Sequence, residues 1–373
     1  MLIAQKYFDF SASHRLARWD WSAEKNRSFF GLESQGAFGH GHNYRLGVGI
    51  SGPVAPNSGM ICELSELKEL LLSTVMPQFD HVYLNAQPAF THCVPTVEAV
   101  VDAIFKASEA QLAAPLVLEQ CTLTESPAGD AVRYRNGELE SAITLQLLEI
   151  PQRIWHRGEI REIIHPLIMR VTFGYQLDPD CHHCQAEQLM KLRFSQWAEA
   201  FQSPRALTLA QYALLFWPLL QVLGPVKRIR LLSLGAQGCS YAGEEWIDAS
   251  VHTTHFWGHH LENPDLSNAQ NLALFGRCFA HHGHTFDLDT TIRMSAFEDQ
   301  LISPQILKVV EAVTQGWNYR SITSELTTFM GKPGTCETVI SELAQQLAPE
   351  IPVIRLSLFE TPNNQFIWQC NRI

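Results

Sequence analysis

Two histidines that share one face of a strand occur twice in this chain, and this repetition constrains the fold more than any other feature. Residues 39–44 read Gly-His-Gly-His-Asn-Tyr. Side chains two positions apart on an extended strand point to the same side, so His40 and His42 face one way. His282 and His284 repeat the His-Gly-His arrangement, and His282 follows His40 by 242 positions. We therefore predict an internal repeat with a pair of imidazoles on one strand face in each copy.

Each pair has a third histidine at a matching place upstream. His14 precedes the first pair in a strand-like segment, and His259 follows His14 by 245 positions. Neutral imidazoles on one face are typical of zinc or iron sites, whose remaining ligands come from elsewhere in the chain. A His-x-His motif alone is weak evidence, so solvated or core histidines are the alternative. The repetition favours two three-histidine metal sites.

Length and composition bound the other possibilities. A chain of 373 residues is long for one domain, so two or three are expected. The net charge of −11 argues against a general nucleic-acid binder, and a charged content of only 17% suits surface buried in an oligomer. We find no apolar run of membrane-spanning length and no signal-peptide pattern. Nine cysteines without disulfide-like spacing fit a reducing cytoplasm.

Hydrophobic periodicity predicts an α+β fold built from repeated units. Residues 1–137 read as strand, strand, helix, helix, strand, strand, with one helix at 63–75 and a second beginning at Thr96. Residues 248–373 repeat this order of elements. The two ranges are therefore predicted to be copies of one unit.

The middle segment, residues 138–247, shows the same order in a fainter form. Helical patterns cover 185–201 and 207–223, with a kink or stop expected at Pro218. The segment is either a degenerate third unit or an α+β linker domain of separate origin. It also contains the run Asp-Cys-His-His-Cys at 180–184, which is either a metal-binding tract or a surface loop.

The motifs of the first and third units come in the order that characterises a known family. They lie at residues 10–16, 39–44, 59–60, 80–81, 84–85, 95–98 and 124–125, and again at 275–278, 282–284, 359–361 and 363–364. On these motifs the chain resembles the 6-pyruvoyl tetrahydropterin synthases and the related 6-carboxytetrahydropterin synthases of queuosine synthesis. The first unit carries the resemblance along nearly its whole length, and the third matches more sparsely.

The resemblance implies a tunnelling fold (T-fold), in which each unit is a four-stranded antiparallel sheet with two helices on one face. Sheets from several units join into a barrel, and active sites lie between units. Three histidines at each site would hold zinc and leave a coordination position open for substrate. The family's zinc ligands correspond to His14, His40 and His42 in the first unit, and to His259, His282 and His284 in the third.

The family anchors its pterin through a glutamate, which corresponds to Glu125 and Glu360. A carboxylate can accept two parallel N–H bonds from the amino-pyrimidinone edge, and this fork geometry makes the contact specific. The middle unit has Leu-Gly-Ala at 234–236 near this position and no evident glutamate.

The proton-transfer groups of the family are divided between the two units. The catalytic thiolate corresponds to Cys278 in the third unit, whereas the first unit has Glu33 at this place. The aspartate–histidine pair corresponds to Asp80 and His81 in the first unit, whereas the third has Asn-Tyr at 318–319. Each unit therefore lacks what the other retains.

The resemblance implies a zinc-dependent lyase acting on 7,8-dihydroneopterin triphosphate, in a homo-oligomer. Because the family takes the cysteine and the acid–histidine pair of one site from neighbouring subunits, we predict a composite site in which Cys278 meets Asp80 and His81. Decay of both units is the alternative, and a pterin-binding scaffold without turnover is the alternative function. Some family members use glutamate in place of the cysteine and cleave the side chain differently, so Glu33 leaves a second activity open.

Overall fold

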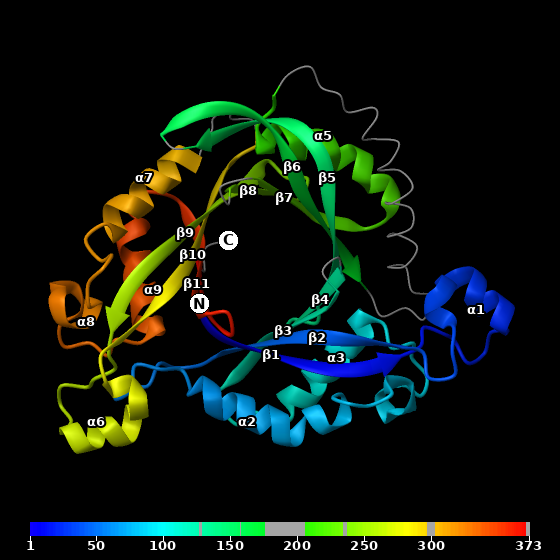
Figure 1. Cartoon of the computed structure of the whole chain (residues 1–373), viewed down its shortest axis with the longest axis horizontal. Helices are drawn as coiled ribbons and strands as arrows, with labels where there is room; N and C mark the ends of the chain where they lie inside the picture. The colour runs from blue at the N-terminus through cyan, green and yellow to red at the C-terminus, as the bar shows by residue number, and fades with distance from the viewer. Residues whose placement is uncertain (127–128, 157, 176–205, 234–236, 297–302, 371–373) are drawn as a thin grey trace.

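Twelve strands close one antiparallel barrel in the computed structural model of the chain (Figure 1). The structure describes residues 1–126, 129–156, 158–175, 206–233, 237–296 and 303–370. Each strand pairs with the next along the chain, and the last one returns to pair with the first. Because the barrel is closed, these strands leave no unpaired edge. The strands are β1 Leu2–His14, β2 His40–Ser51, β3 Val117–Ser126, β4 Gly129–Tyr134, β5 Leu139–His156, β6 Glu159–Tyr175, β7 Val226–Ser233, β8 Gln237–Tyr241, β9 Trp246–His259, β10 His282–Ser295, β11 Val353–Thr361 and β12 Asn364–Gln369.

Helices cover the outer side of the barrel (Figure 1). They are α1 Ala23–Phe30, α2 Leu64–Thr74, α3 Val97–Glu109, α5 Leu209–Leu220, α6 Asn268–Phe275, α7 Ser303–Thr314, α8 Ile322–Glu325 and α9 Cys336–Leu347. α1 and α6 project at the periphery, whereas α3, α5 and α9 pack along the strands. Within the described ranges, no helix combines the length and apolar character needed to cross a membrane.

The second helix of the first unit and that of the third begin in the same way. Thr96 caps α3 by accepting a hydrogen bond from the backbone N–H of Ala99, and Thr335 caps α9 through Thr338. Each helix then buries a stripe of apolar side chains at helical spacing. Burying one such side chain stabilises the fold by about 1.5–3 kcal/mol. The stripes comprise Val97, Val100, Val101 and Ile104 in α3, and Val339, Ile340, Leu343 and Leu347 in α9.

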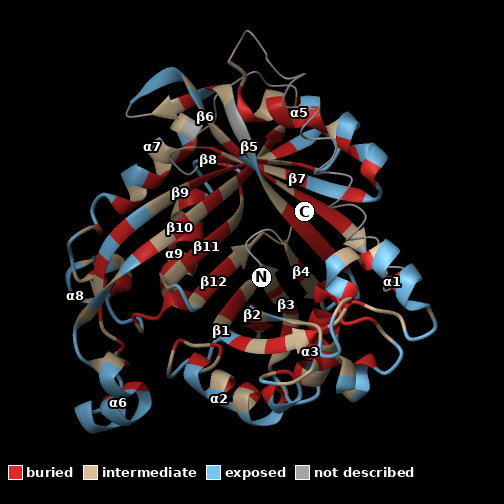
Figure 2. Cartoon of the chain, turned by 45° about the vertical axis from the view of Figure 1, so that its right-hand side comes forward, coloured by how far each residue is buried: buried red, intermediate tan, exposed pale blue. Residues whose placement is uncertain are grey.

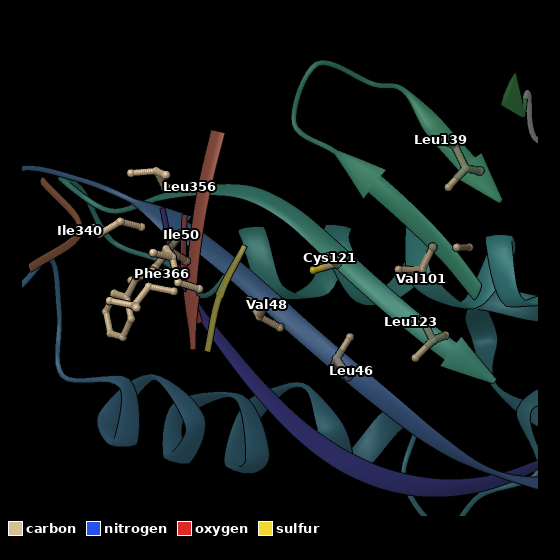
Figure 3. Packing of buried hydrophobic residues seen from close by; sticks show 14 of the residues in the cluster. Leu46, Val48, Ile50, Val101, Cys121, Leu123, Leu139, Ile340, Leu356 and Phe366 are labelled. Atoms are coloured by element: carbon tan, nitrogen blue, oxygen red, sulfur yellow. The ribbon is translucent and has the colours of Figure 1, made fainter. Parts of the chain in front are cut away.

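The hydrophobic core forms a shell between the strands and the helices (Figure 2). Figure 3 shows part of it, with Leu46, Val48 and Cys121 on the strands and Val101 on α3. One continuous cluster of buried side chains includes members of all three predicted units. The units therefore share a single core.

The structure confirms the predicted antiparallel strands. It also confirms three predicted helices: 63–75 is α2, the helix that begins at Thr96 is α3, and 207–223 is α5. Pro218 lies inside α5, which ends two residues later. The predicted helix 185–201 lies outside the described residues.

Strands β5 and β6 are longer than their hydrophobic patterns indicate. The sequence predicts strands at 143–148 and 167–173, whereas β5 has 18 residues and β6 has 17. The end of β6 that follows the turn from β5 carries exposed apolar side chains, Ile160 at 49% and Ile164 at 67%. The apolar pattern is lost on the β6 side of this hairpin, where Ile160 and Ile164 are exposed, whereas β5 still buries Gln152 and Ile154. The division at 137 and 247 stays a prediction.

Candidate functional site

The first three histidines meet where β1 and β2 lie side by side. His14 pairs directly with His40 across the strands, and His42 pairs with Ala12 two positions along. Cross-strand partners and residues two apart share a face, so the three imidazoles lie together with ring centres 4.7, 4.9 and 5.0 Å apart. One ligand nitrogen from each lies within 4.8 Å of the others. We call His14, His40 and His42 the first triad.

The second group repeats this geometry on β9 and β10. His259 pairs with His282, and His284 pairs with Trp257. The ring centres lie 4.4 to 5.2 Å apart, and ligand nitrogens again lie within 4.8 Å. We call His259, His282 and His284 the second triad. The described ranges contain no third group of this kind, and their part of the middle segment therefore has no counterpart.

Backbone carbonyls orient the buried imidazole of each triad. Nδ1 of His14 lies 2.7 Å from the carbonyl oxygen of Pro95, and Nδ1 of His259 lies 2.9 Å from that of Gly334. A carbonyl can only accept, so Nδ1 carries the hydrogen and Nε2 keeps its lone pair. Nε2 of His259 and Nε2 of His42 are buried without a hydrogen-bond partner among the described residues. Both triads thus present unsatisfied acceptor nitrogens.

Burial keeps these imidazoles neutral. It lowers the pKa of His14 to about 3 and that of His259 to about 4, although the carbonyl bonds oppose the shift. Burial also lowers the pKa of His42 and His284. Each triad thus has two imidazoles whose pKa is lowered by burial and one buried Nε2 without a hydrogen-bond partner among the described residues, and three histidine ligands suit catalytic zinc, which keeps a fourth position open. The residues therefore fit zinc in donor type and number.

Glu125 lies beside the first triad at the end of β3. Its Oε1 is 3.5 Å from Nε2 of His14 and accepts a hydrogen bond from the Tyr44 hydroxyl at 3.1 Å. Burial raises the pKa of Tyr44, and the Glu125 charge adds to the shift, so this hydroxyl stays a donor. The carboxylate is thus held at the metal-binding face.

Glu360 occupies the corresponding place beside the second triad. Its Oε1 lies 3.9 Å from Nε2 of His259 and 3.8 Å from Nε2 of His284. Its Oε2 accepts a hydrogen bond from the side-chain amide of Asn364 at 2.9 Å. The side-chain oxygen of Asn364 accepts a hydrogen bond from Nζ of Lys6 at 2.6 Å. Asn364 therefore links the carboxylate to an ammonium group of the first unit.

A cavity of about 720 Å³ opens beside the second triad, between the first and third predicted units. Both units line it, so this hollow is composite. The third unit contributes His282, His284, Cys278, Glu337 and Glu360, and the first contributes Lys6, Met60, Cys62, Glu63, Leu64 and Ser65.

Cys278 and Glu33 occupy equivalent positions in the two units. Each is the third residue of a 3-10 turn, η1 Gly31–Ser34 or η6 Gly276–Phe279. Both turns begin with a glycine at positive φ, 62° for Gly31 and 53° for Gly276. The backbone carbonyl of Glu33 accepts a hydrogen bond from the N–H of Leu16 at 3.0 Å, and that of Cys278 accepts one from the N–H of Leu261 at 2.8 Å. Each leucine lies two positions after the first histidine of its triad. Glu33 and Cys278 therefore occupy matching turns, and the replacement of the family's cysteine by glutamate stays a prediction that this match supports.

The Cys278 thiol needs a positive charge to ionise. Burial raises its pKa, and the carboxylates of Glu360 and Glu63 add to the shift, whereas Arg277 opposes it. A cation on the second triad would supply the missing charge.

Asp80 and His81 lie beside the first triad. The Asp80 carboxylate accepts bonds from Nδ1 of His81 at 2.7 Å and from the backbone N–H of Ser11 at 3.0 Å. The backbone N–H of His81 donates to the Ser11 carbonyl, with φ at 55°. His81 and His42 line one hollow of about 500 Å³.

Asn318 and Tyr319 replace this pair in the third unit. Asn318 accepts a bond from the backbone N–H of Phe256 at 3.0 Å, and the N–H of Tyr319 donates to Phe256 at 2.8 Å. Tyr319 also has positive φ, 61°. The backbone is thus retained, whereas an amide and a phenol stand where the acid and the imidazole were.

One chain does not bring Cys278 together with Asp80 and His81. Lys6 lines the Cys278 cavity, whereas Asp80 is bound at Ser11, five positions further along β1. Five strand residues span about 16 Å. The two hollows also share no described lining residue. The predicted composite of these three residues is therefore not formed within a single chain.

Sequence reasoning missed the contact that joins the two units at the cavity. The buried Glu337 carboxylate accepts a bond from the backbone N–H of Ile61 at 3.1 Å, and Thr335 donates to the Gly59 carbonyl at 2.7 Å. Burial raises the pKa of Glu337 to about 7. The motif at 59–60 was a usable signal, since it matched the family without an assigned role.

Two further predictions lie outside the described residues. These are the Cys/His run at 180–184 and the segment 234–236, where the middle unit would carry its anchor.

A family model described as 6-pyruvoyl tetrahydropterin synthase matches residues 3–136 and 249–370. Human 6-pyruvoyl tetrahydrobiopterin synthase is 39% identical over 92 residues, 24% of this chain and 63% of that protein. The Drosophila melanogaster enzyme of the same name is 32% identical over 127 residues, 34% of this chain and 74% of that one. The chain therefore spans less than two thirds of the human relative.

Among solved structures, Caenorhabditis elegans 6-pyruvoyl tetrahydropterin synthase is 32% identical to the chain. The match covers 36% of this chain and 96% of that one, with a TM-score of 0.34. The family model therefore matches both outer units.

Proposed function

The chain belongs to the 6-pyruvoyl tetrahydropterin synthase family, and from this premise we propose that it is a zinc-dependent lyase acting on 7,8-dihydroneopterin triphosphate. Its product would be of the 6-pyruvoyl or 6-carboxy type. One observation carries the proposal: a single cavity is lined by His282, His284, Cys278 and Glu360. A metal site, a thiol and a carboxylate around one hollow are the groups that such a reaction uses.

Each group of this cavity has a separate task. The second triad would hold zinc, which when bound acts as a Lewis acid on the side-chain hydroxyls. Glu360 accepts two N–H bonds from the pterin edge, and Asn364 keeps this carboxylate in place. Sγ of Cys278 takes a proton from the side-chain carbon, which lets the triphosphate depart or the side chain break.

Asp80 and His81 would complete the proton relay from a second copy of the chain. The Asp80 carboxylate holds the Nδ1–H of His81, so Nε2 carries the free lone pair. The His81 side chain is 82% exposed. An exposed, oriented imidazole suits proton transfer across an interface. A homo-oligomer is therefore part of the proposal.

We also propose that residues 1–137, 138–247 and 248–373 are three copies of a tunnelling-fold unit, the middle one degenerate. Each range contributes four successive strands to the barrel, and the outer two share triads and turns. A cytoplasmic location, a place in queuosine synthesis and the absence of nucleic-acid binding stay predictions.

The test is to incubate the zinc-loaded chain with dihydroneopterin triphosphate and to identify the products by chromatography. We expect a 6-pyruvoyl or 6-carboxy product that disappears in Cys278→Ala. Cys62→Ala is the matched control, because Cys62 lines the same cavity from the first unit, and it should keep activity. A zinc-bound chain without product would contradict the proposal and support the pterin-binding scaffold.

Glu33 supports a second candidate activity in the first unit. Glu33 is the third residue of η1, as Cys278 is of η6, and its backbone carbonyl accepts a hydrogen bond from Leu16, two positions after His14 of the first triad. A carboxylate base there would cleave the side chain and release 6-hydroxymethyl dihydropterin. This product should persist in Cys278→Ala and vanish in Glu33→Gln. Its loss in Cys278→Ala would assign it to the third unit instead.

A further inference from the structure

Glu125 and Glu360 sit in matching bulges of two hairpins. In the first unit, the register of β3 and β4 shifts between Thr124 and Ser126, so Glu125 is the extra residue of the pairing. In the third unit, the register of β11 and β12 shifts in the same way around Glu360. Bulges next to active sites re-aim a side chain, and each of these carboxylates lies beside a triad. The backbone therefore places both glutamates alike.

The side chains that hold the two carboxylates differ. Glu125 accepts a hydrogen bond from the Tyr44 hydroxyl at 3.1 Å. The corresponding residue of the third unit is Phe286. Each of these aromatic residues follows the last histidine of its triad by two positions, and its ring centre lies 5.7 Å from that of the histidine. Phenylalanine has no hydroxyl to donate, so the third unit holds its carboxylate through another group.

That group is the side-chain amide of Asn364, whose Nδ2 donates to Oε2 of Glu360 at 2.9 Å. Asn364 pairs with Thr361 across the β11–β12 hairpin, and the matching pair of the first unit is Gly129 with Ser126. Glycine carries no side chain. The first unit therefore has no counterpart to this amide at the matching position.

Lys6 reaches Asn364 across the pairing of β1 with β12, which closes the barrel and which we call the seam. Lys6 stands directly opposite Asn364 in the register, and its Nζ donates to Oδ1 of Asn364 at 2.6 Å. An ammonium group can only donate, so Oδ1 faces Lys6 and Nδ2 faces the carboxylate. At the matching place, Gly129 pairs with the apolar Ile143. Of the two anchors, Glu360 alone is therefore held from the neighbouring unit in this way.

The contact between Lys6 and Asn364 is a charge-assisted hydrogen bond. Burial lowers the pKa of Lys6, and Lys68 adds to this shift, whereas the charges of Glu360 and Glu63 oppose it. Hydrogen bonds of this kind are short and about twice as strong as neutral ones, and the distance of 2.6 Å agrees with this character. Lys6 therefore restrains the amide more firmly than a neutral side chain would.

We propose that Lys6 is a positioning residue for the pterin anchor of the third unit and that it acts through Asn364. The inference rests on the proposed function, in which Glu360 binds the amino-pyrimidinone edge. Because the amide fixes Oε2, the plane of the carboxylate is set, and its other lone pairs can face two parallel N–H groups. The first unit thus orients the anchor of the third across the seam.

The test is a fluorescence titration of the zinc-loaded chain with pterin, which carries no phosphate. The Glu125→Gln background limits the signal to the Glu360 anchor. We expect Lys6→Met to weaken binding about 10-fold, at the lower end of the effect of a hydrogen bond to a charged group. Lys6→Gln retains a donor and should recover part of this loss. Lys68→Met is the matched control, because it removes a second ammonium that acts on Lys6, and it should leave binding unchanged.

A double-variant cycle separates positioning from a general effect on the fold. Asn364→Leu should weaken pterin binding, and Lys6→Met should add no further loss in its presence, because Lys6 acts through this amide. Thermal unfolding of each variant checks that the barrel is intact. Losses that add independently would overturn the proposal, and so would pterin binding that Lys6→Met leaves unchanged.

Turnover of dihydroneopterin triphosphate distinguishes this inference from the proposed function. In Lys6→Met we expect KM to rise about 10-fold with kcat unchanged, as loss of binding alone predicts. A chain that binds pterin in a Lys6-dependent manner but forms no product would contradict the proposed function and support the inference. Full turnover with an unaltered KM in Lys6→Met would do the reverse. A variant that loses affinity for inorganic triphosphate but not for pterin would place Lys6 at the phosphates and overturn the inference.

Discussion

The first and third units build the same metal-binding face but differ in the groups placed beside it. Both hold a buried histidine through a backbone carbonyl, both begin the following turn at a left-handed glycine, and both end a strand in a glutamate. The first unit places Glu33 in that turn and keeps Asp80 and His81, whereas the third unit places Cys278 there and has Asn318 and Tyr319. Backbone geometry was thus retained where side-chain chemistry diverged.

The cavity sharpens this contrast. Beside the second triad, the first unit closes the hollow with Lys6 and the segment 60–65. At the first triad the hollow that the structure describes is lined by first-unit residues alone, among them His42 and His81. This difference supports our proposal that the main lyase step takes place in the third unit.

The largest expected effect concerns the base. Cys278→Ala should lower the rate of 6-pyruvoyl or 6-carboxy product formation by about 10²–10⁴, the usual contribution of a general base. Glu33→Ala should leave that product unchanged, because Glu33 belongs to the other site. Single-turnover product formation measures both. Equal losses in the two variants would break the distinction between the units.

The acid–histidine pair provides the next test. His81→Ala should lower turnover by about 10², because proton transfer through an oriented imidazole is lost, whereas Tyr319→Ala should not. Cys278→Ala and His81→Ala damage different hollows of one chain. When the two variant proteins are mixed and allowed to exchange subunits, activity should return. Inactive mixtures that demonstrably form mixed oligomers would argue against a site shared between chains.

The anchoring glutamates should differ in their importance for the main product. Glu360→Gln replaces one acceptor of the pterin fork with a donor, which should cost about 1.5–3 kcal/mol of binding and raise KM about 10- to 100-fold. Glu125→Gln serves as the matched variant and should leave this KM unchanged. Initial rates over a range of substrate concentrations decide the point.

Metal content should divide evenly between the triads. We expect two zinc ions per chain, one for each triad. His259→Ala and His14→Ala should each lose one ion, measured by elemental analysis after dialysis against a weak chelator. Only the His259 variant should lose the main activity. A chain that retains both ions in either variant would contradict the assignment of ligands.

The smallest effect is on stability, at the contact between the units. The folded pKa of Glu337 is raised to about 7, from 4.5 in the unfolded chain. A carboxyl group whose pKa is higher in the folded than in the unfolded chain stabilises the fold below pH 4.5, and this contribution is lost as the pH rises through 7. In denaturant unfolding, the free energy of unfolding of the unaltered chain, taken relative to that of Glu337→Gln, should therefore fall by about 3 kcal/mol between pH 4.5 and pH 7.

Much of the fold could be predicted because its signals are local. Apolar residues at helical spacing marked α2, α3 and α5, and Thr96 marked where α3 begins. The two triads were predictable since an antiparallel ladder brings His14 opposite His40 and His259 opposite His282. The contact of Glu337 with Ile61 was not, because 276 positions separate them and nothing local encodes their meeting.

The sequence by itself determined the histidine triads, the replacement of cysteine by Glu33 and the membership of a pterin-synthase family, because each depends on a few residues at short spacing. Only the tertiary structure decided which unit closes the Cys278 cavity and that Asp80 and His81 lie in a separate hollow. Barrel closure pairs β12 with β1 and turns alternate side chains of all strands toward a common centre. Those neighbours are set by long-range register, which no short stretch of sequence contains.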